Sequence, residues 1–171
     1  MSATATAPER QERHRRALSK AFAARVLAVQ GLYQAEVLGL QDIGLLDQDY
    51  RAPRLGVRLA DIGAKAVDPA LLDDLMQGAW AQREDLDHMI SGLLTASWRV
   101  ERLDSVLRAL LRVGLYELAE HRDRPAQLII QQFVQIAGAF WGDKVPGLVN
   151  ATLDTAAQTL RDMEAEAPKP S

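Results

Sequence analysis

The chain contains no cysteine, which excludes both a disulfide framework and any metal site built on cysteine ligands. It also lacks a run of about 18 consecutive apolar residues, the length that a membrane-spanning helix requires. The opening residues, MSATATAPER, contain no apolar segment of the kind that a secretory signal needs. These absences together predict a cytoplasmic protein that does not contact a membrane.

Recognisable catalytic motifs are absent as well. The sequence contains neither the H-E-x-x-H pattern of zinc hydrolases nor a glycine-rich loop of the kind that cradles phosphate groups. Asp85 and His88 have the spacing found in half of a di-iron site, but no second helix supplies the other half. His88 and His121 are therefore expected to be solvent-exposed helix residues, and we predict no catalytic residue, no metal and no cofactor. An enzyme without any recognisable motif is the least favoured alternative.

Charge is unevenly distributed along a chain whose apolar content, 48% of 171 residues, is typical of one globular domain. Residues 1–25 hold six basic and two acidic side chains, a net charge of +4, so the remainder carries −7 of the total of −3. The basic residues of this segment are Arg10, Arg13, Arg15, Arg16, Lys20 and Arg25. Such an arm either binds a polyanion or is the solvated start of a helix, and charge alone leaves both interpretations open.

Helical periodicity begins near Leu18 and predicts a long first helix. One face is apolar, with Leu18, Phe22, Val26, Val29, Tyr33, Val37 and Leu40. A second face consists of small residues, namely Ala24, Ala28, Gly31 and Ala35. We therefore expect neighbours to enclose this helix on both sides, with its basic first turns projecting outward.

The later segments predict further helices joined by turns. Asp68 and Pro69 form an N-cap and first-turn pair that opens one helix, whose inward residues run through 72–94. A helix that is apolar nearly all round in 106–118 is expected to be a second central element. Two more helices follow, one from Pro125 to Gly142 and one at the end of the chain.

These elements predict an all-α bundle without an internal repeat. Residues 1–17 are expected to form a basic N-terminal arm or helix extension, residues 18–163 a single helical domain, and residues 164–171 a disordered tail. The segment 41–68 is the least regular, and Pro53 and the glycines there favour an ordered loop.

Three sequence segments then narrow the interpretation. They are ARVLAVQGLYQAE (24–36), LRALLRVGLYEL (107–118) and PAQLIIQQFVQIAGAF followed by GLVNATLD (125–154). In this order and at these separations they resemble the NusB transcription antitermination family. The resemblance implies two small helical subdomains around shared central helices. It also implies binding of a boxA-type single-stranded ribosomal leader RNA with a NusE-like small-subunit ribosomal protein, in the RNA polymerase antitermination complex, without catalysis.

The resemblance also predicts which residues contact RNA. They are Arg13, Arg15, Arg16, Lys20, Arg25, Lys144 and Asn150. Lysine and arginine would neutralise phosphates, whereas the bases of single-stranded RNA are read by stacking and by edge contacts. Asn150 has a second, favoured interpretation, a buried amide that ties the last helix to the preceding loop. Tyr33 and Tyr116 are interpreted as packing residues, and Trp141 as the best candidate for an exposed aromatic ring.

The sequence also departs from the family pattern. The dense cluster in 13–16 lies one to two helical turns upstream of the usual position, which here keeps only Lys20 and Arg25. Leu148 stands where a phenylalanine is common, and a leucine cannot stack on a base as an aromatic ring does. Uncharged side chains replace asparagine and acidic residues at Gln131, Gln132 and Gln135.

These departures favour an alternative, a divergent NusB-like protein-interaction module that has lost tight boxA RNA binding. The RNA-binding domain of a ribosomal RNA methyltransferase is a further alternative, although no Rossmann-like half is expected in this sequence. The weakly charged face of residues 129–141 is compatible with a homodimer.

Overall fold

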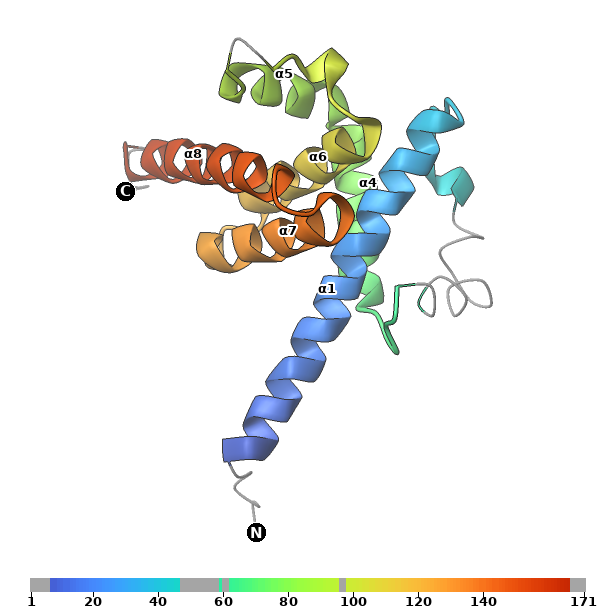
Figure 1. The fold of residues 1–171 in the computed structure, drawn as a ribbon, viewed down its shortest axis with the longest axis vertical. Helices are drawn as coiled ribbons and strands as arrows, with labels where there is room; N and C mark the ends of the chain where they lie inside the picture. Colours follow the sequence, from blue (N-terminus) through green and yellow to red (C-terminus); the bar gives the residue numbers. More distant parts are fainter. Residues whose placement is uncertain (1–6, 47–58, 60–61, 96–97, 167–171) are drawn as a thin grey trace, which may run out of the picture.

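The computed structural model describes the backbone of residues 7–46, 59, 62–95 and 98–166, and the side chains within these ranges from residue 20 to residue 161. This part of the chain contains six α-helices and two short 3-10 helices, and no strand (Figure 1). In chain order they are α1 (Ala7–Val37), η1 (Ile43–Leu46), α4 (Pro69–Ala81), α5 (Arg83–Leu93), η2 (Val100–Arg102), α6 (Ser105–Glu120), α7 (Ala126–Trp141) and α8 (Val145–Glu166). The all-α prediction is confirmed.

Helix α1 has two halves with different surroundings. Every residue in 23–29 is buried, which confirms the expectation that neighbours enclose this helix on both its apolar and its small faces. Its N-terminal turns extend beyond the other helices (Figure 1). The helix ends at Val37, and Gly39 in the turn that follows adopts a φ of +64°, which lets Leu40 N–H donate to the Ala35 carbonyl at 2.9 Å. This left-handed glycine satisfies carbonyls that the last turn would otherwise leave unpaired.

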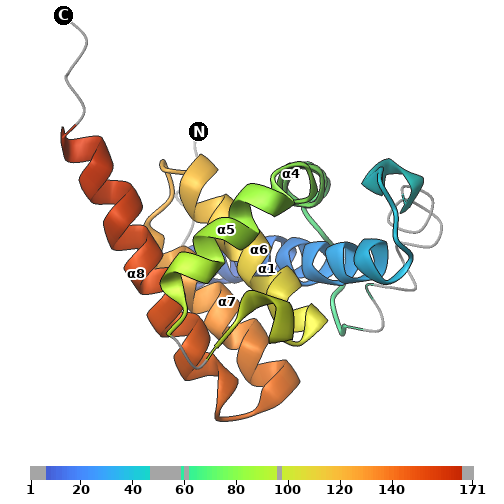
Figure 2. The same ribbon diagram turned by 90° about the horizontal axis from the view of Figure 1, so that it is seen from above.

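Helix α6 is the second central element, as the sequence predicts. All residues in 109–118 are buried, and α6 contacts α1, α4, α5, α7 and α8. Its N-cap is Asp104, whose side chain accepts hydrogen bonds from Val106 N–H at 2.9 Å and Leu107 N–H at 3.3 Å. Figure 2 shows α1 and α6 between α4 on one side and the α7–α8 pair on the other. These two shared helices hold the two parts of the bundle together.

The helix that Asp68 opens is shorter than the sequence predicts. Asp68 is the N-cap of α4, with its Oδ1 atom accepting from Leu71 N–H at 3.0 Å, but α4 stops at Ala81 and α5 begins at Arg83. The break falls at Gln82, where the Arg83 guanidinium donates to the Trp80 carbonyl at 2.8 Å and lies 4.4 Å from the centre of the Trp80 ring. The expectation of one continuous helix over 72–94 is therefore wrong. A change of direction allows the apolar residues of α5 to reach α6.

Helices α7 and α8 form an antiparallel pair. The turn between them begins at Gly142, whose φ of +67° confirms the predicted helix end. The apolar residues of α7 are used in the chain's own core, namely Ile129, Ile130, Phe133, Ile136 and Ala137. Helix α8 continues to Glu166, past the predicted start of the tail, and residues 167–171 lie outside the described residues.

The segment between α1 and α4 is described only in part. Helix η1 buries Ile43 and Leu46, and the Asp42 carboxylate accepts from Gly44 N–H at 2.8 Å. The predicted loop around Pro53 lies outside the described residues. No helix in the described ranges is long and apolar enough to cross a membrane.

Candidate nucleic-acid interface

The basic arm predicted from the sequence is part of α1 rather than a separate segment. Arg13, Arg15 and Arg16 belong to the helical turns that extend beyond the bundle, and their side chains lie outside the described residues. Lys20 is exposed, and its carbonyl accepts a hydrogen bond from Asp68 N–H at 3.2 Å. This contact marks where α1 leaves the bundle, so the basic turns begin at the edge of the folded core.

Arg25 lies in a different environment from the rest of the predicted set. The residue is 3% exposed, and its guanidinium donates to both carboxylate oxygens of Glu117, at 2.8 and 2.5 Å. Glu117 on α6 is fully buried and also accepts from Arg124 at 3.0 Å. Gln132 on α7 accepts a further hydrogen bond from Arg25 at 3.5 Å. Arg25 therefore connects three helices, and its guanidinium is buried, unlike the exposed RNA contact that the sequence predicts.

A second, partly buried ion network connects α1, α5 and α6. Arg112 donates to Asp87 through two nitrogens at 2.7 Å and to Glu36 at 2.7 Å, and Arg108 pairs with the other oxygen of Glu36. Burial alone would lower the pKa of Arg112, but the hydrogen bonds and the charges of Asp87 and Glu36 outweigh it and raise the pKa. Arg112 therefore keeps its charge in the core, and the network fixes α5 against the central helices.

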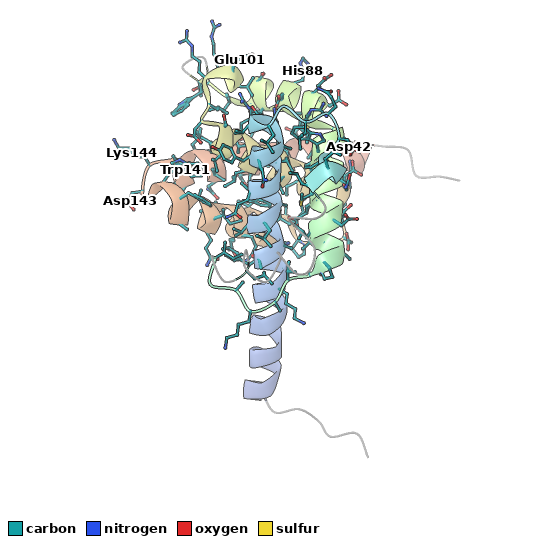
Figure 3. The ribbon with its side chains drawn as sticks, turned by 90° about the vertical axis from the view of Figure 1, so that its right-hand side faces the viewer. Asp42, His88, Glu101, Trp141, Asp143 and Lys144 are labelled. Carbon is teal, nitrogen blue, oxygen red and sulfur yellow. The ribbon has the colours of Figure 1, made fainter. Side chains whose placement is uncertain are left out.

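The α7–α8 turn presents polar and aromatic groups to solvent. Lys144 and Asp143 project from the turn, with Trp141 beside them (Figure 3). Asn150, one helical turn into α8, is exposed, so its interpretation as a buried amide is wrong. Exposure leaves its amide available to a ligand.

The exposed aromatic ring at this turn is Phe140 rather than Trp141. Phe140 is 47% exposed, whereas Trp141 is half-buried and packs against the core. The two rings are tilted against each other with centroids 5.5 Å apart. Phe140 lies seven residues after the buried Phe133 on α7, and its ring is exposed in the last turn of that helix. Leu148 also packs against the core and is half-buried.

A second exposed patch lies at the C-terminal end of α1. Tyr33, Val37 and Leu38 are 39%, 63% and 58% exposed, and with Gln30 and Gln34 they line a groove of about 340 Å³. The sequence assigned Tyr33 and Val37 to the packing face, but α1 has passed its neighbours at this point. The result is an apolar groove, which is a common feature of protein-binding surfaces.

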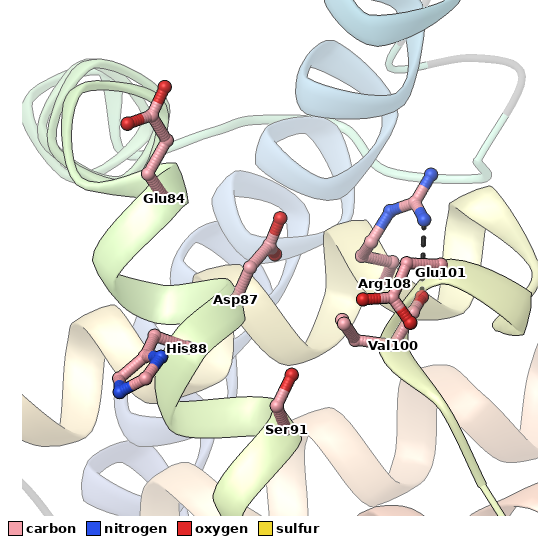
Figure 4. A pocket seen from close by; sticks show the side chains of 7 residues that line it. All are labelled: Glu84, Asp87, His88, Ser91, Val100, Glu101 and Arg108. Atoms are coloured by element: carbon pink, nitrogen blue, oxygen red, sulfur yellow. Dashed lines mark hydrogen bonds between the residues drawn. The ribbon is translucent and has the colours of Figure 1, made fainter.

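A polar cleft beside α5 is not suited to a phosphate. It has a volume of about 290 Å³, and Figure 4 shows side chains of α5, η2 and α6 lining it. The lining residues are Glu84, Asp87, His88, Ser91, Val100, Glu101 and Arg108. Three carboxylates outnumber the single arginine, so the cleft repels anions. No cluster of metal-binding side chains occurs among the described residues.

The two described histidines differ in their surroundings. His88 is exposed as expected, but the Nε2 atom of His121 lies 2.5 Å from the Asp74 carboxylate of α4. Tyr116 is buried, as its packing interpretation predicts, and donates to the other oxygen of Asp74 at 2.9 Å. Burial, followed by the hydrogen bond and charge of Asp74, raises the pKa of Tyr116 to about 12. Tyr116 therefore remains a hydrogen-bond donor throughout the physiological range.

The fold and these exposed groups define an all-helical binding protein built around two buried central helices, with a basic helical extension. The family model of the NusB family matches residues 23–158. A transcription antitermination protein NusB from Rhizobium etli (strain CIAT 652) is 36% identical over 153 residues, covering 90% of this chain and 95% of the relative. The chain belongs to the NusB family.

Solved structures have the same fold. T. maritima NusB aligns with a TM-score of 0.59 and 25% identity, covering 81% of this chain and 90% of that one. A chain in the crystal structure of antitermination factors NusB and NusE in complex with double-stranded RNA aligns with a TM-score of 0.64 and 22% identity, covering 81% and 96%. The NusB-like helical architecture predicted from the sequence is thus confirmed.

Proposed function

We propose that this chain is an RNA-binding transcription antitermination factor that binds boxA-type single-stranded RNA together with a NusE-like small-subunit ribosomal protein. The observation that carries the proposal is the division of α1, whose basic turns extend beyond the bundle while residues 23–29 are buried within it. The names of the relatives support the antitermination role. The proposed function is binding alone, without catalysis, a metal or a cofactor, in the cytoplasm and as part of the RNA polymerase antitermination complex.

Two groups of side chains would contact the RNA. Arg13, Arg15, Arg16 and Lys20 would neutralise phosphates along the extended part of α1, with Lys144 adding a further charge at the α7–α8 turn. Asn150 would supply hydrogen bonds to a base edge, which its exposure permits. Phe140 would stack on a base in place of the phenylalanine that the family often has near Leu148.

Arg25 has another role in this proposal. A phosphate contact would require its guanidinium to leave a fully buried carboxylate, which would strand the charge of Glu117 in the core. We therefore assign Arg25 to positioning: it holds α1 against α6 and α7 and so directs the basic turns.

The groove of Tyr33, Val37 and Leu38 is our candidate surface for the partner protein. It is the described surface where several large apolar side chains of one helix are exposed together. Apolar patches of this kind favour a protein partner over RNA, because removal of apolar area from water drives protein association.

The experiment that tests the proposal is fluorescence anisotropy of a labelled boxA-type RNA and a scrambled RNA over a salt series, with and without the NusE-like protein. We expect a preference for boxA that increases when the partner is present. With about four phosphate contacts, log K should fall with log salt at a slope near −3. Equal, weak binding of both RNAs in the presence of the partner would contradict the proposal.

One observation favours the alternative of a protein-interaction module without tight RNA binding. The exposed side of α7 contains Gln131 and Gln135, which offer no charge to a phosphate. Retained partner binding combined with a weak, salt-independent RNA signal would support this alternative.

A further inference from the structure

We propose that Trp98, Arg99 and Arg102 form a second contact site for single-stranded RNA, separate from the basic turns of α1 and from the α7–α8 turn. We refer to these three side chains as the η2 site, because they lie in and directly before η2. The inference rests on the proposed function, since it concerns the path of the same RNA.

The first observation is the exposure of Trp98. Of the three tryptophans in the chain, Trp80 is buried, Trp141 packs against the core, and Trp98 is 46% exposed. A tryptophan ring normally buries most of its large apolar surface, so one left open on a folded domain is a candidate for a ligand contact. No ring contact to Trp98 is present among the described residues.

The second observation is the charge beside the ring. Arg99 and Arg102 are exposed, and neither side chain has a hydrogen-bond or ion-pair partner within the described ranges. Glu101 lies between them in sequence, but its side chain lines the acidic cleft with Asp87 and His88 (Figure 4). Within the described ranges, two guanidinium groups without a carboxylate partner therefore lie close to Trp98 in the sequence.

The third observation is that the backbone of this segment is held in place. Val100 is buried, and its carbonyl accepts a hydrogen bond from Arg108 of α6 at 3.2 Å (Figure 4). The neighbouring Leu103 is also buried, and its N–H donates to the same carbonyl at 3.3 Å. The segment is thus anchored at two apolar positions while the ring and the arginines remain outside. A site of this kind loses little conformational entropy on binding.

The chemistry of the η2 site indicates a single-stranded nucleic acid as its ligand. Bases stack on aromatic rings with little sequence preference, and arginine pairs with phosphates through its planar fork. A protein partner would instead favour a continuous apolar surface, such as the groove of Tyr33, Val37 and Leu38. The location agrees with this: η2 and the α7–α8 turn lie toward the same side of the molecule in Figures 2 and 3. One strand could therefore contact both.

The test compares full-length variants on a short and a long boxA-type RNA, with probes of about 6 and 16 nucleotides. We expect W98A to weaken binding of the long RNA by about 5- to 150-fold, the factor that corresponds to one stacked base. Binding of the short RNA should change less than twofold, because the arm and the α7–α8 turn are intact. W98F should retain most of the affinity, since a phenyl ring still stacks.

The double variant R99A/R102A should reduce the magnitude of the salt slope for the long RNA by about 1.4, or about 0.7 for each lost phosphate contact.

Matched controls separate these effects from general changes of surface. L45A removes a side chain that is 69% exposed outside the η2 site, and R122A removes an exposed charge beyond the opposite end of α6. Neither control should alter RNA affinity, and circular dichroism should show all variants folded.

The outcomes distinguish this inference from the proposed function. If the wild-type chain binds the long RNA and W98A binds it equally well, the η2 site is wrong and the proposed function stands. If W98A loses only affinity for the NusE-like protein, the site is a protein contact and the inference is overturned. If the wild-type chain binds neither RNA, the proposed function fails and the η2 site fails with it.

Discussion

The two halves of α1 both contain basic residues, but these residues have different roles. Lys20 is exposed where the helix leaves the bundle, whereas Arg25, five residues later, is buried against a carboxylate of α6. Both positions contribute to one basic segment in the sequence, and only the neighbouring helices separate them. A cluster of like charges in a sequence is therefore not one functional unit, because each charge takes its role from what packs against it.

The largest effect that this comparison predicts is on stability. R25A should lower the free energy of unfolding by about 3–5 kcal/mol, because it leaves the buried charge of Glu117 without its main partner. K20A, which removes one charge from an exposed position of the same helix, should change it by less than about 0.5 kcal/mol. Urea denaturation of both variants measures the difference.

A double variant provides the control for R25A. Replacement of Arg25 and Glu117 together by methionine should restore much of the lost stability, since no unpaired charge then remains in the core apart from the partly exposed Arg124. Equal stability of R25A and K20A would contradict the positioning role. A salt slope that decreased in R25A without any loss of stability would show that Arg25 contacts a phosphate.

Substitutions in the turns of α1 that extend beyond the bundle should affect RNA binding and leave the fold intact. Combined replacement of Arg15, Arg16 and Lys20 by alanine should reduce the magnitude of the salt slope by about 2, or about 0.7 per phosphate on single-stranded RNA. Between 50 and 200 mM salt, the wild-type chain should then lose about 20-fold more affinity than the variant. Anisotropy titrations at several salt concentrations test this, and an unchanged slope would show that these turns are only a solvated helix end.

A charge placed in the apolar groove at the C-terminal end of α1 should weaken binding of the protein partner. V37E places a charge in the apolar groove beside Tyr33 and Leu38, so it should weaken binding of the NusE-like protein by about tenfold or more while RNA binding without the partner is unchanged. Surface plasmon resonance with immobilised partner provides the measurement. L45A, at an exposed apolar position outside the groove, serves as the control.

The smallest predicted effect concerns a polar group in the core away from α1. Y116F removes the hydrogen bond to Asp74 and should cost about 1–2 kcal/mol at neutral pH. Because folding raises the pKa of Tyr116 from its ordinary value of about 10 to about 12, the folded state holds this proton more tightly. The contribution of Tyr116 is therefore complete below about pH 10 and is lost as the pH rises toward 12.

Denaturation curves from pH 8 to pH 12 test this last prediction. The difference in stability between the wild-type chain and Y116F should narrow over the upper part of that range. A constant difference would show that the proton of Tyr116 is not linked to folding.

The local structure of several elements could be predicted from the sequence because their signals are short-range. Asp68 followed by Pro69 opens a helix through its own side chain, and Gly142 ends one through a backbone conformation that other residues rarely adopt. Likewise, a helix that is apolar all round, such as residues 109–118, has to be central, since no face of it suits water.

The features that the sequence did not predict have a common cause, the way in which the helices pack against one another. The break at Gln82 accompanies the packing of α5 against α6, and the burial of Arg25 depends on Glu117, which is 92 residues away in the sequence. Asn150 is exposed on the outward side of α8, and Phe140 is exposed in the last turn of α7. None of these features has a periodic signal, because helix periodicity reports which face is apolar and not how far a neighbour extends.

By itself, therefore, the amino-acid sequence determined the all-helical class, the two central helices and the basic segment at the start of the chain, because each depends on residue type and spacing along one helix. The tertiary structure decided which charges face solvent. Lys20 is exposed, whereas the guanidinium group of Arg25 on the same helix meets the carboxylate of Glu117, which only folding brings near. It also decided where aromatic rings remain open, at Phe140 and Trp98. The exposure of a side chain depends on which helices pack around it, so the sequence of a single segment does not determine it.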